Sequence, residues 1–142
     1  MSKTAKAPLS YRATMTNTQR IIPILVYADI AAAHDFLVDT FGFTSGGLHH
    51  DNGQVVHAEV SMDGEAVWLH RVVADQMLRS PSELGAATGM LNVFVDDVDA
   101  HHAHSVAAGA TVLNPPIDQP YGQREYAATD PENRVWSFAT RP

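Results

Sequence analysis

The decisive stretch of the chain is IIPILVYADIAAAHDFLVDTFG, residues 21–42, which recurs in altered form as LNVFVDDVDAHHAHSVAAG, residues 91–109. In each copy an apolar run ends at an aspartate, an alanine-rich helical pattern follows, and the pattern stops at a glycine. Aspartate caps a helix by accepting backbone N–H bonds, and glycine adopts the left-handed conformation that ends one. Asp29 and Asp97 are 68 residues apart, and Gly42 and Gly109 are 67 apart. We therefore predict two copies of one structural unit, each with a helix.

The remainder of each copy is predicted to form strands. Residues 57–62 alternate polar and apolar side chains, turn at Asp63-Gly64 and return through 66–70, which is typical of a β-hairpin. Residues 123–129 and 135–139 form the corresponding hairpin of the second copy, and a less regular strand is expected before each hairpin. The fold class is therefore α+β: two βαβββ modules forming a curved, cavity-enclosing mixed sheet. The expected boundaries are an N-terminal flexible arm at 1–17, module 1 at about 18–73, a linker at about 74–89 and module 2 at about 90–142.

Composition limits the classes of partner. The 142 residues include 9 Lys and Arg against 16 Asp and Glu, for a net charge of −7, and the basic residues do not cluster, so nucleic-acid binding is not expected. No apolar run approaches the roughly 20 residues that span a bilayer, so no membrane partner is expected. The chain has no cysteine, which suits a reducing cytosol and predicts a cytoplasmic location.

The chain carries a series of short motifs in order, namely Val26-Tyr27-Ala28-Asp29, Phe36-Leu37, Phe41-Gly42-Phe43, Phe94-Val95-Asp96-Asp97-Val98, Ala107-Ala108-Gly109-Ala110, Tyr121-Gly122-Gln123-Arg124-Glu125-Tyr126, Asp130-Pro131-Glu132 and Trp136-Ser137-Phe138. By these motifs and their spacing the chain resembles the vicinal oxygen chelate superfamily, which includes glyoxalase I, bleomycin-binding proteins and extradiol dioxygenases. The resemblance covers roughly residues 18–141, and its C-terminal part is most similar to the PhnB-like branch. It implies the glyoxalase/bleomycin-resistance fold, a homodimer, and clefts that hold a small molecule.

The resemblance also implies four metal-ligand positions, one at the start of each leading strand and one in each closing strand. Counting from the capping aspartates and the turns places them at Ile22, Met90, Trp68 and Ser137. None is a His, Glu or Gln, whereas a divalent metal requires oxygen or imidazole donors. We therefore predict no metal and no cofactor, and the metal-dependent chemistries of the superfamily have no support from these positions.

Strand parity predicts which side chains face the cavity. Val67, Leu69, Trp136 and Phe138 should pack against the helices, because the helix-covered face of a sheet is apolar. The residues that alternate with them, and their cross-strand partners, should face the cavity. The predicted ligand-binding residues are Ile24, His57, Glu59, Trp68, His70, Asn92, Phe94, Gln123, Glu125 and Ser137.

Four of these residues are also candidates for catalysis, namely His57, Glu59, His70 and Glu125. His57 and His70 should lie opposite each other on paired strands, either as an acid–base pair, as ligand contacts, or as hydrogen-bonded residues at the rim. The remaining polar groups are interpreted structurally. Residues 101–104, with three histidines, are expected on a solvated helix face, residues 49–53 in a polar loop, and Arg124 and Tyr126 facing away from the cavity.

The preferred hypothesis is a metal-free binding protein, homodimeric, that sequesters an aromatic or bulky organic ligand such as an antibiotic. An aromatic-walled cavity with a few polar groups suits binding. The alternative is a metal-dependent lyase, isomerase or dioxygenase whose metal lies on displaced ligands such as His57, Glu59, His70 or Glu125. A third hypothesis is an accessory subunit that uses its sheets for protein contacts.

Overall fold

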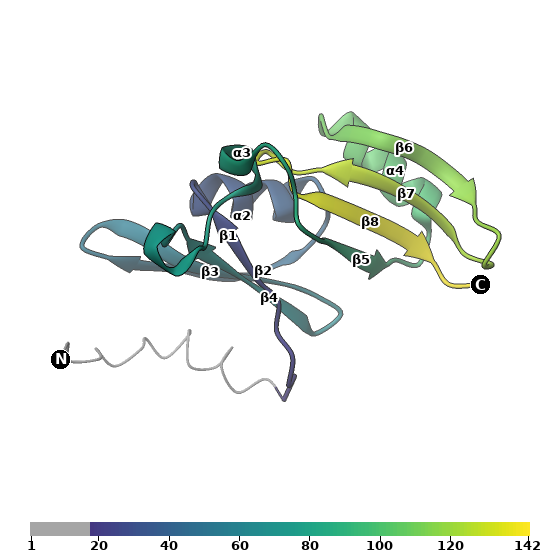
Figure 1. Ribbon diagram of the computed structural model, residues 1–142. Coiled ribbons are helices and arrows are strands. Elements are labelled where there is room, and N and C mark those ends of the chain that lie inside the picture. The colour runs from purple at the N-terminus through teal and green to yellow at the C-terminus, as the bar shows by residue number, and fades with distance from the viewer. Residues whose placement is uncertain (1–17) are drawn as a thin grey trace.

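The computed structural model describes residues 18–142, which form two βαβββ modules joined by a linker (Figure 1). The α+β prediction is confirmed. The elements of module 1 are β1 (Ile24–Tyr27), α2 (Ile30–Asp39), β2 (Thr44–Asp51), β3 (Gln54–Met62) and β4 (Glu65–Arg71). The linker carries a 3-10 turn (Ala74–Gln76) and α3 (Pro81–Leu84). The elements of module 2 are β5 (Met90–Phe94), α4 (Val98–Ala107), β6 (Thr111–Asp118), β7 (Arg124–Thr129) and β8 (Val135–Thr140).

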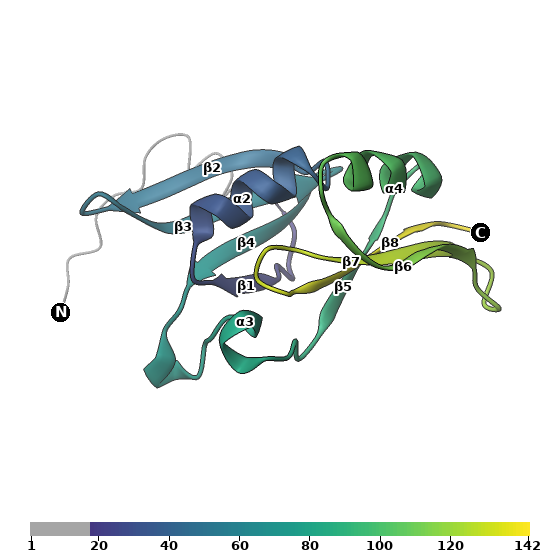
Figure 2. The same ribbon diagram turned by 90° about the horizontal axis from the view of Figure 1, so that it is seen from above.

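Each module forms its own four-stranded mixed sheet. The strand orders are β1-β4-β3-β2 and β5-β8-β7-β6, so β1 and β5 are edge strands. In each sheet the first strand runs parallel to the last, and the other pairs are antiparallel. The helices α2 and α4 lie on the same side of the molecule (Figure 2), and we call the opposite, helix-free face of each sheet its open face. Among residues 18–142, no helix has the length and apolar character needed to cross a membrane.

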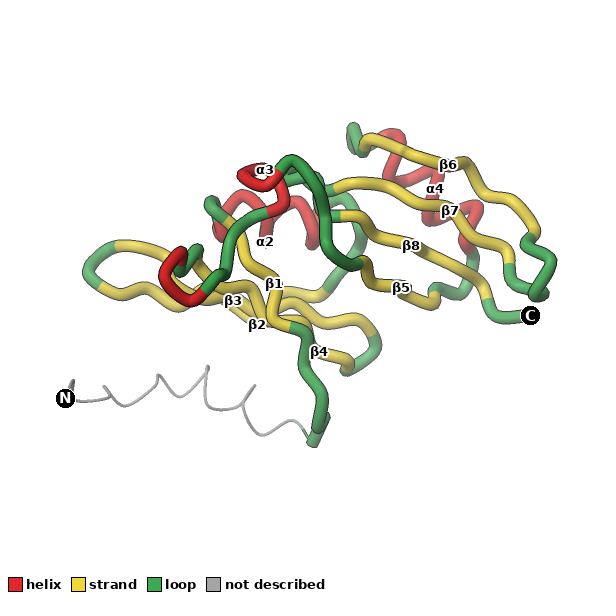
Figure 3. The backbone as a smooth tube through the Cα atoms, in the orientation of Figure 1, coloured by secondary structure: helices red, strands yellow, loops and turns green. Residues whose placement is uncertain are grey.

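The helix N-caps and the hairpin turn predicted from the repeat are present in the structure. Asp29 Oδ1 accepts the N–H of Ala32 at 3.0 Å, and Asp97 Oδ1 accepts the N–H of Ala100 at 3.1 Å, so both aspartates cap their helices. Asp63 and Gly64 have φ angles of 49° and 83°, the backbone of the tight turn that joins two twisted antiparallel strands. The linker appears as loop with two short helical turns (Figure 3).

Two strand boundaries differ from the sequence prediction. The first strand begins at Ile24 instead of residue 21, because Pro23 has no N–H to donate to a ladder. The second strand continues to Asp51, so the polar loop predicted for residues 49–53 is wrong except for the turn at Asn52-Gly53. Two register shifts in this strand, one of them directly after His49, break the alternation that would have identified it.

The modules share an aromatic core on the helix side. Phe41 and Phe43, which follow α2, pack against Phe138 and Trp136 of β8 with ring centroids 4.8 and 5.4 Å apart. Trp136 and Phe138 are fully buried, as the parity argument predicted. Burying several rings in edge-to-face contact favours one fixed packing of the two modules.

Helix α4 also binds the end of α2 by hydrogen bonds. His101 was expected on a solvated face, and that expectation is wrong, because the ring is half-buried and its Nε2 donates to the Phe41 carbonyl at 2.7 Å. Burial lowers the pKa of His101. His104, which is exposed, donates in the same way to the Asp39 carbonyl at 3.0 Å. His104 thereby satisfies a carbonyl group that the end of a helix leaves without an intrahelical partner, and His101 binds the carbonyl of the residue that follows the C-cap Thr40.

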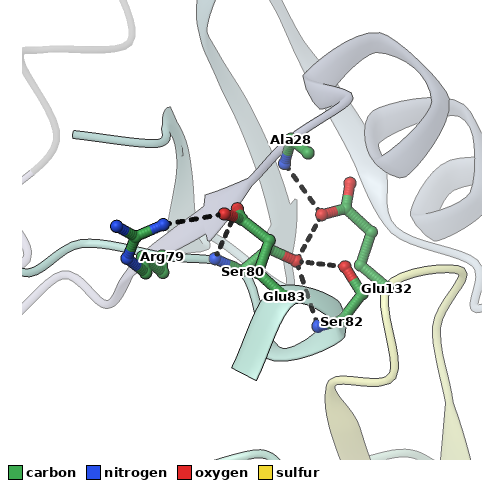
Figure 4. Close-up of polar contacts among 6 residues, drawn as sticks. All are labelled: Ala28, Arg79, Ser80, Ser82, Glu83 and Glu132. Atoms are coloured by element: carbon green, nitrogen blue, oxygen red, sulfur yellow. Dashed lines mark hydrogen bonds and ion pairs between the residues drawn. The ribbon is translucent and has the colours of Figure 1, made fainter. Parts of the chain in front are cut away.

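The turn between β7 and β8 connects module 2 to module 1 through a buried carboxylate. Glu132 accepts the N–H of Ala28 at 2.8 Å and the hydroxyl of Ser80 in the linker at 2.5 Å (Figure 4). It also accepts the N–H of Asp29 at 2.9 Å. Ser80 in turn begins α3 with a capping box completed by Glu83. The carboxylate thus binds β1, the start of α2 and the linker together.

Asp130 in the same turn makes a second buried connection. Its Oδ2 accepts the hydroxyl of Tyr27 at 2.5 Å and the indole N–H of Trp136 at 3.1 Å. Its Oδ1 accepts the N–H groups of Glu132 and Arg134, which shapes the turn. Burial and the negative charge of Asp130 raise the pKa of Tyr27. We call Asp130 and Glu132 the inter-module latch.

Candidate functional site

The open face of sheet 1 brings together five of the predicted ligand-binding residues. The strand register pairs Ile24 with Trp68, Trp68 with Glu59, and His70 with His57, so all five side chains share one face. The residues that alternate with them, such as Leu69 and Val60, are fully buried under α2. Ile24 is 53% exposed, which is unusual for an isoleucine on a strand.

Trp68 is held in place on this face by its neighbours. Its indole N–H donates to Glu59 Oε1 at 2.9 Å, and the His57 ring meets it edge-on with centroids 5.4 Å apart. Glu59 is only 6% exposed, whereas Trp68 is half-buried. The result is an aromatic surface of fixed orientation with a carboxylate beside it.

The histidines of sheet 1 form a row across three strands. His57 pairs with His70 on one side, as predicted, and with His49 on the other. Burial, followed by the proximity of His70 and His49, lowers the pKa of His57 to about 4. His70 donates its Nδ1–H to the Arg71 carbonyl at 2.8 Å, which fixes its tautomer. At neutral pH the His57 ring is therefore uncharged.

Four of the other predicted residues, Asn92, Phe94, Glu125 and Ser137, lie on the open face of sheet 2, and Gln123 directly precedes β7. Ser137 donates its hydroxyl to Asn92 Oδ1 at 3.1 Å, and Phe94 carries the Arg141 guanidinium 3.9 Å above its ring. Gln123 donates to one oxygen of Glu125 at 2.6 Å, and the Tyr121 hydroxyl donates to the other. Glu125 is thus held by two donors, which makes it a poor candidate for a general base.

Arg124 and Tyr126 have the structural roles that parity predicts. Arg124 pairs with Asp99 and Asp118 at the surface, with nitrogen–oxygen distances of 3.0 and 3.3 Å. Tyr126 is buried and donates to the Ser105 hydroxyl at 3.0 Å. Neither side chain belongs to an open face.

Two cavities border these faces. The larger has a volume of about 760 Å³ and lies between the modules, along β5 and the tip of the β3–β4 hairpin, with Asn92, Phe94 and Arg141 in its wall. The smaller has a volume of about 400 Å³, is polar, and includes His57, His70 and Arg71. The two groups of predicted residues therefore belong to two neighbouring surfaces, one on each module.

The donor set does not suit the metal that the superfamily resemblance implies. The residue directly opposite Trp68 is Ile24, and the residue opposite Ser137 is Asn92. Indole, alkyl and thioether side chains cannot hold a divalent cation. Within residues 18–142 no group of three or more His, Asp or Glu side chains has an arrangement that could hold a metal, and Glu125 lies on the other sheet from His57, Glu59 and His70.

Sequence reasoning missed several residues near these surfaces. His49 joins the histidine row only because of the bulges in β2, and Gly46 packs directly against Glu59. Tyr121 and Arg141 lie outside the strands, where parity gives no prediction. Of these four residues, only Tyr121 had a signal in the sequence, because it belongs to the motif Tyr121-Gly122-Gln123.

Known proteins with this architecture were found both by sequence and by structure. The chain is 33% identical over 120 residues to an uncharacterized protein of Mycobacterium tuberculosis, covering 82% of this chain and 71% of that protein. It is 28% identical over 127 residues to a bleomycin resistance protein of Geobacillus stearothermophilus, covering 82% and 92%. The crystal structure of TioX from Micromonospora sp. ML1 superimposes with a TM-score of 0.71 and 30% identity, covering 87% and 99%.

The fold and the two open faces thus define a glyoxalase-like protein built from paired βαβββ modules. The family model of the Glyoxalase/Bleomycin resistance protein/Dioxygenase superfamily matches residues 18–138. The chain belongs to this superfamily.

Proposed function

We propose that this protein binds an aromatic or bulky organic molecule on its open faces, without a metal and as a homodimer. The observation that carries the proposal is the Trp68 indole, which Glu59 orients on a helix-free face beside the exposed Ile24. A preoriented aromatic wall binds a planar ligand at low entropic cost. Sequestration of such a ligand requires affinity and no chemical step.

The comparisons support a binding role for this fold. One relative is named for bleomycin resistance. The chemistry of the chain agrees, because Ile22, Trp68, Met90 and Ser137 supply no suitable donor set for the superfamily's metal. A stacking contact with Trp68 would contribute about 1 kcal/mol beyond the buried area.

Exposed apolar side chains on the same faces support the proposed homodimer. Ile24, Met90 and Ile117 are 53%, 55% and 45% exposed, and all three lie on open faces by strand register. Large apolar side chains left exposed on these faces are candidates for burial by a partner. A second copy that covers part of both faces would turn them into closed clefts.

Tryptophan fluorescence tests the proposal directly. The chain has two tryptophans, and Trp136 is fully buried in the core, so quenching by planar aromatic compounds should come from Trp68. Trp68→Phe keeps Trp136 and should abolish the quenching. A panel of acridines and similar polycyclic compounds that neither quenches nor raises the Tm would overturn the proposal. Metal analysis of tag-free protein tests the absence of a metal, and we expect less than about 0.1 divalent ion per chain. Light scattering tests the homodimer, and we expect the mass of two chains.

A further inference from the structure

Glu59 occupies an exceptional position on the open face of sheet 1. It lies at the centre of the sheet, between Trp68 on β4 and the bulge Gly46-Gly47 on β2, and 94% of its surface is buried, since 6% is exposed. One carboxylate oxygen accepts the indole N–H of Trp68. A neutral donor of this kind orients the carboxylate without neutralising its charge.

No cation among residues 18–142 compensates that charge. The ion pairs there join His34 to Asp35, Arg79 to Glu83, and Arg124 to Asp99 and Asp118, and none involves Glu59. The nearest titratable neighbour on the same strand, His57, has its pKa lowered to about 4 and is therefore neutral at pH 7. A buried carboxylate without a counter-ion costs free energy that a bound cation would recover.

The packing around Glu59 leaves one direction of approach. A Cβ atom added to Gly46 would lie 2.4 Å from Glu59 Oε2 and 2.8 Å from Glu59 Cβ, so the β2 backbone closes that side. The helix-covered face below is filled by Val60 and Leu69, which are fully buried. Approach is therefore from the open face, across the surface of Trp68.

We infer that the ligand of the open face is a planar organic cation, whose charge pairs with Glu59 while its ring stacks on Trp68. This inference rests on the proposed binding function and specifies its ligand class. Tryptophan is the aromatic side chain that best attracts a cation, and a carboxylate beside it adds a direct ion pair. One carboxylate and one indole supply too few donor atoms for a metal ion. A delocalised organic cation needs only one carboxylate and an aromatic face. The net charge of −7 adds long-range attraction for cations.

Two probes with the same ring system test the inference. At pH 7.5, 9-aminoacridine is a cation and acridine-9-carboxylate is an anion, and both can be followed by quenching of Trp68. We expect the cation to bind at least 10-fold more tightly at constant ionic strength. Equal affinities, or tighter binding of the anion, would overturn the inference and leave the proposed function intact. Binding of neither probe would overturn both.

A matched pair of variants separates the site from the general charge of the protein. Glu59→Gln keeps an oxygen for the Trp68 N–H and removes the charge, and it should weaken 9-aminoacridine about 10-fold without weakening the anion. Glu65→Gln removes one charge from an exposed side chain at the first residue of β4, the neighbouring strand of the hairpin, and should change the affinity less than 2-fold. Equal losses in both variants would show that the preference is a property of net charge and would refute the role of Glu59. If Glu59→Gln does not fold, the ratio of the affinities of the unmodified protein for 9-aminoacridine and acridine-9-carboxylate still tests whether the site prefers a cation.

Discussion

Removal of the Glu132 carboxylate should destabilise the whole domain. The carboxylate accepts the N–H groups of Ala28 and Asp29 and the hydroxyl of Ser80, at 2.8, 2.9 and 2.5 Å. Hydrogen bonds to a charged group contribute about 1.5–3 kcal/mol each, and groups left unsatisfied in a buried site add a desolvation cost. Because the three bonds share one acceptor group and are not additive, we expect Glu132→Ala to lower the free energy of unfolding by about 3–5 kcal/mol.

The measurement is urea unfolding followed by circular dichroism, with thermal unfolding in parallel. In a domain of this size a loss of 3–5 kcal/mol should lower the Tm by about 10–15 °C. Ser80→Ala removes one of the three donors and should cost about 1 kcal/mol. In the double variant with Glu132→Ala, Ser80→Ala should cost less than it does alone, because its acceptor is already absent and only its capping contact at the start of α3 is lost.

The matched control is Glu65→Ala, which removes the same side chain from an exposed position at the first residue of β4. Surface substitutions of this kind change stability by about 0.5 kcal/mol or less. A loss below about 1 kcal/mol in Glu132→Ala, or a loss equal to that of the control, would refute the view that the latch joins the modules.

Three further outcomes are expected. The pKa of His57 is about 4 in the folded chain and near 6.5 in the unfolded chain. As the pH falls, the unfolded chain therefore binds a proton at His57 at a higher pH than the folded chain does. Stability should therefore fall as the pH drops from about 6.5 towards 4, by about 1–2 kcal/mol after solvent screening, and His57→Asn should flatten the slope of Tm against pH. Tyr27→Phe should cost about 1–3 kcal/mol in urea unfolding, since Asp130 loses its hydroxyl donor; an unchanged midpoint would contradict this. Gly46→Ala should displace the Glu59 side chain and weaken 9-aminoacridine to the level of Glu59→Gln, and unaltered affinity would show that β2 does not confine the carboxylate.

Local signals in the sequence predicted the repeat and the orientation of the hairpins. The capping aspartates and the Asp63-Gly64 turn depend on residues within a few positions of each other, and so they can be read directly. Strand parity placed Trp136 in the core and Trp68 on the open face for the same reason, since side chains alternate along a regular strand.

The features that sequence did not reveal depend on irregular or distant geometry. The bulges in β2 shift the alternation, so His49 could not be assigned to the histidine row. His101 binds the carbonyl of Phe41, which is 60 residues away, and helix periodicity holds no information about that partner. Glu132 reads as an ordinary turn residue in the motif Asp130-Pro131-Glu132, and its partners Ala28 and Ser80 are 104 and 52 residues away.

The two hairpin turns show how the repeated units have diverged. The β7–β8 turn carries the latch and binds module 1, whereas the β3–β4 turn has only Asp63-Gly64 and borders the cavity of about 760 Å³ at the edge of β5. In module 1 the main-chain N–H groups of Ala28 and Asp29 are satisfied by Glu132, and no contact within residues 18–142 satisfies the equivalent groups of Asp96 and Asp97 in module 2. The latch thus adds, at the β7–β8 turn, a connection to the aromatic core and to the His101 and His104 contacts that also join the modules. Because the latch lies apart from Trp68 and Glu59, substitutions in the latch should change stability without changing the preference for a cationic ligand, whereas substitutions at Glu59 should change that preference.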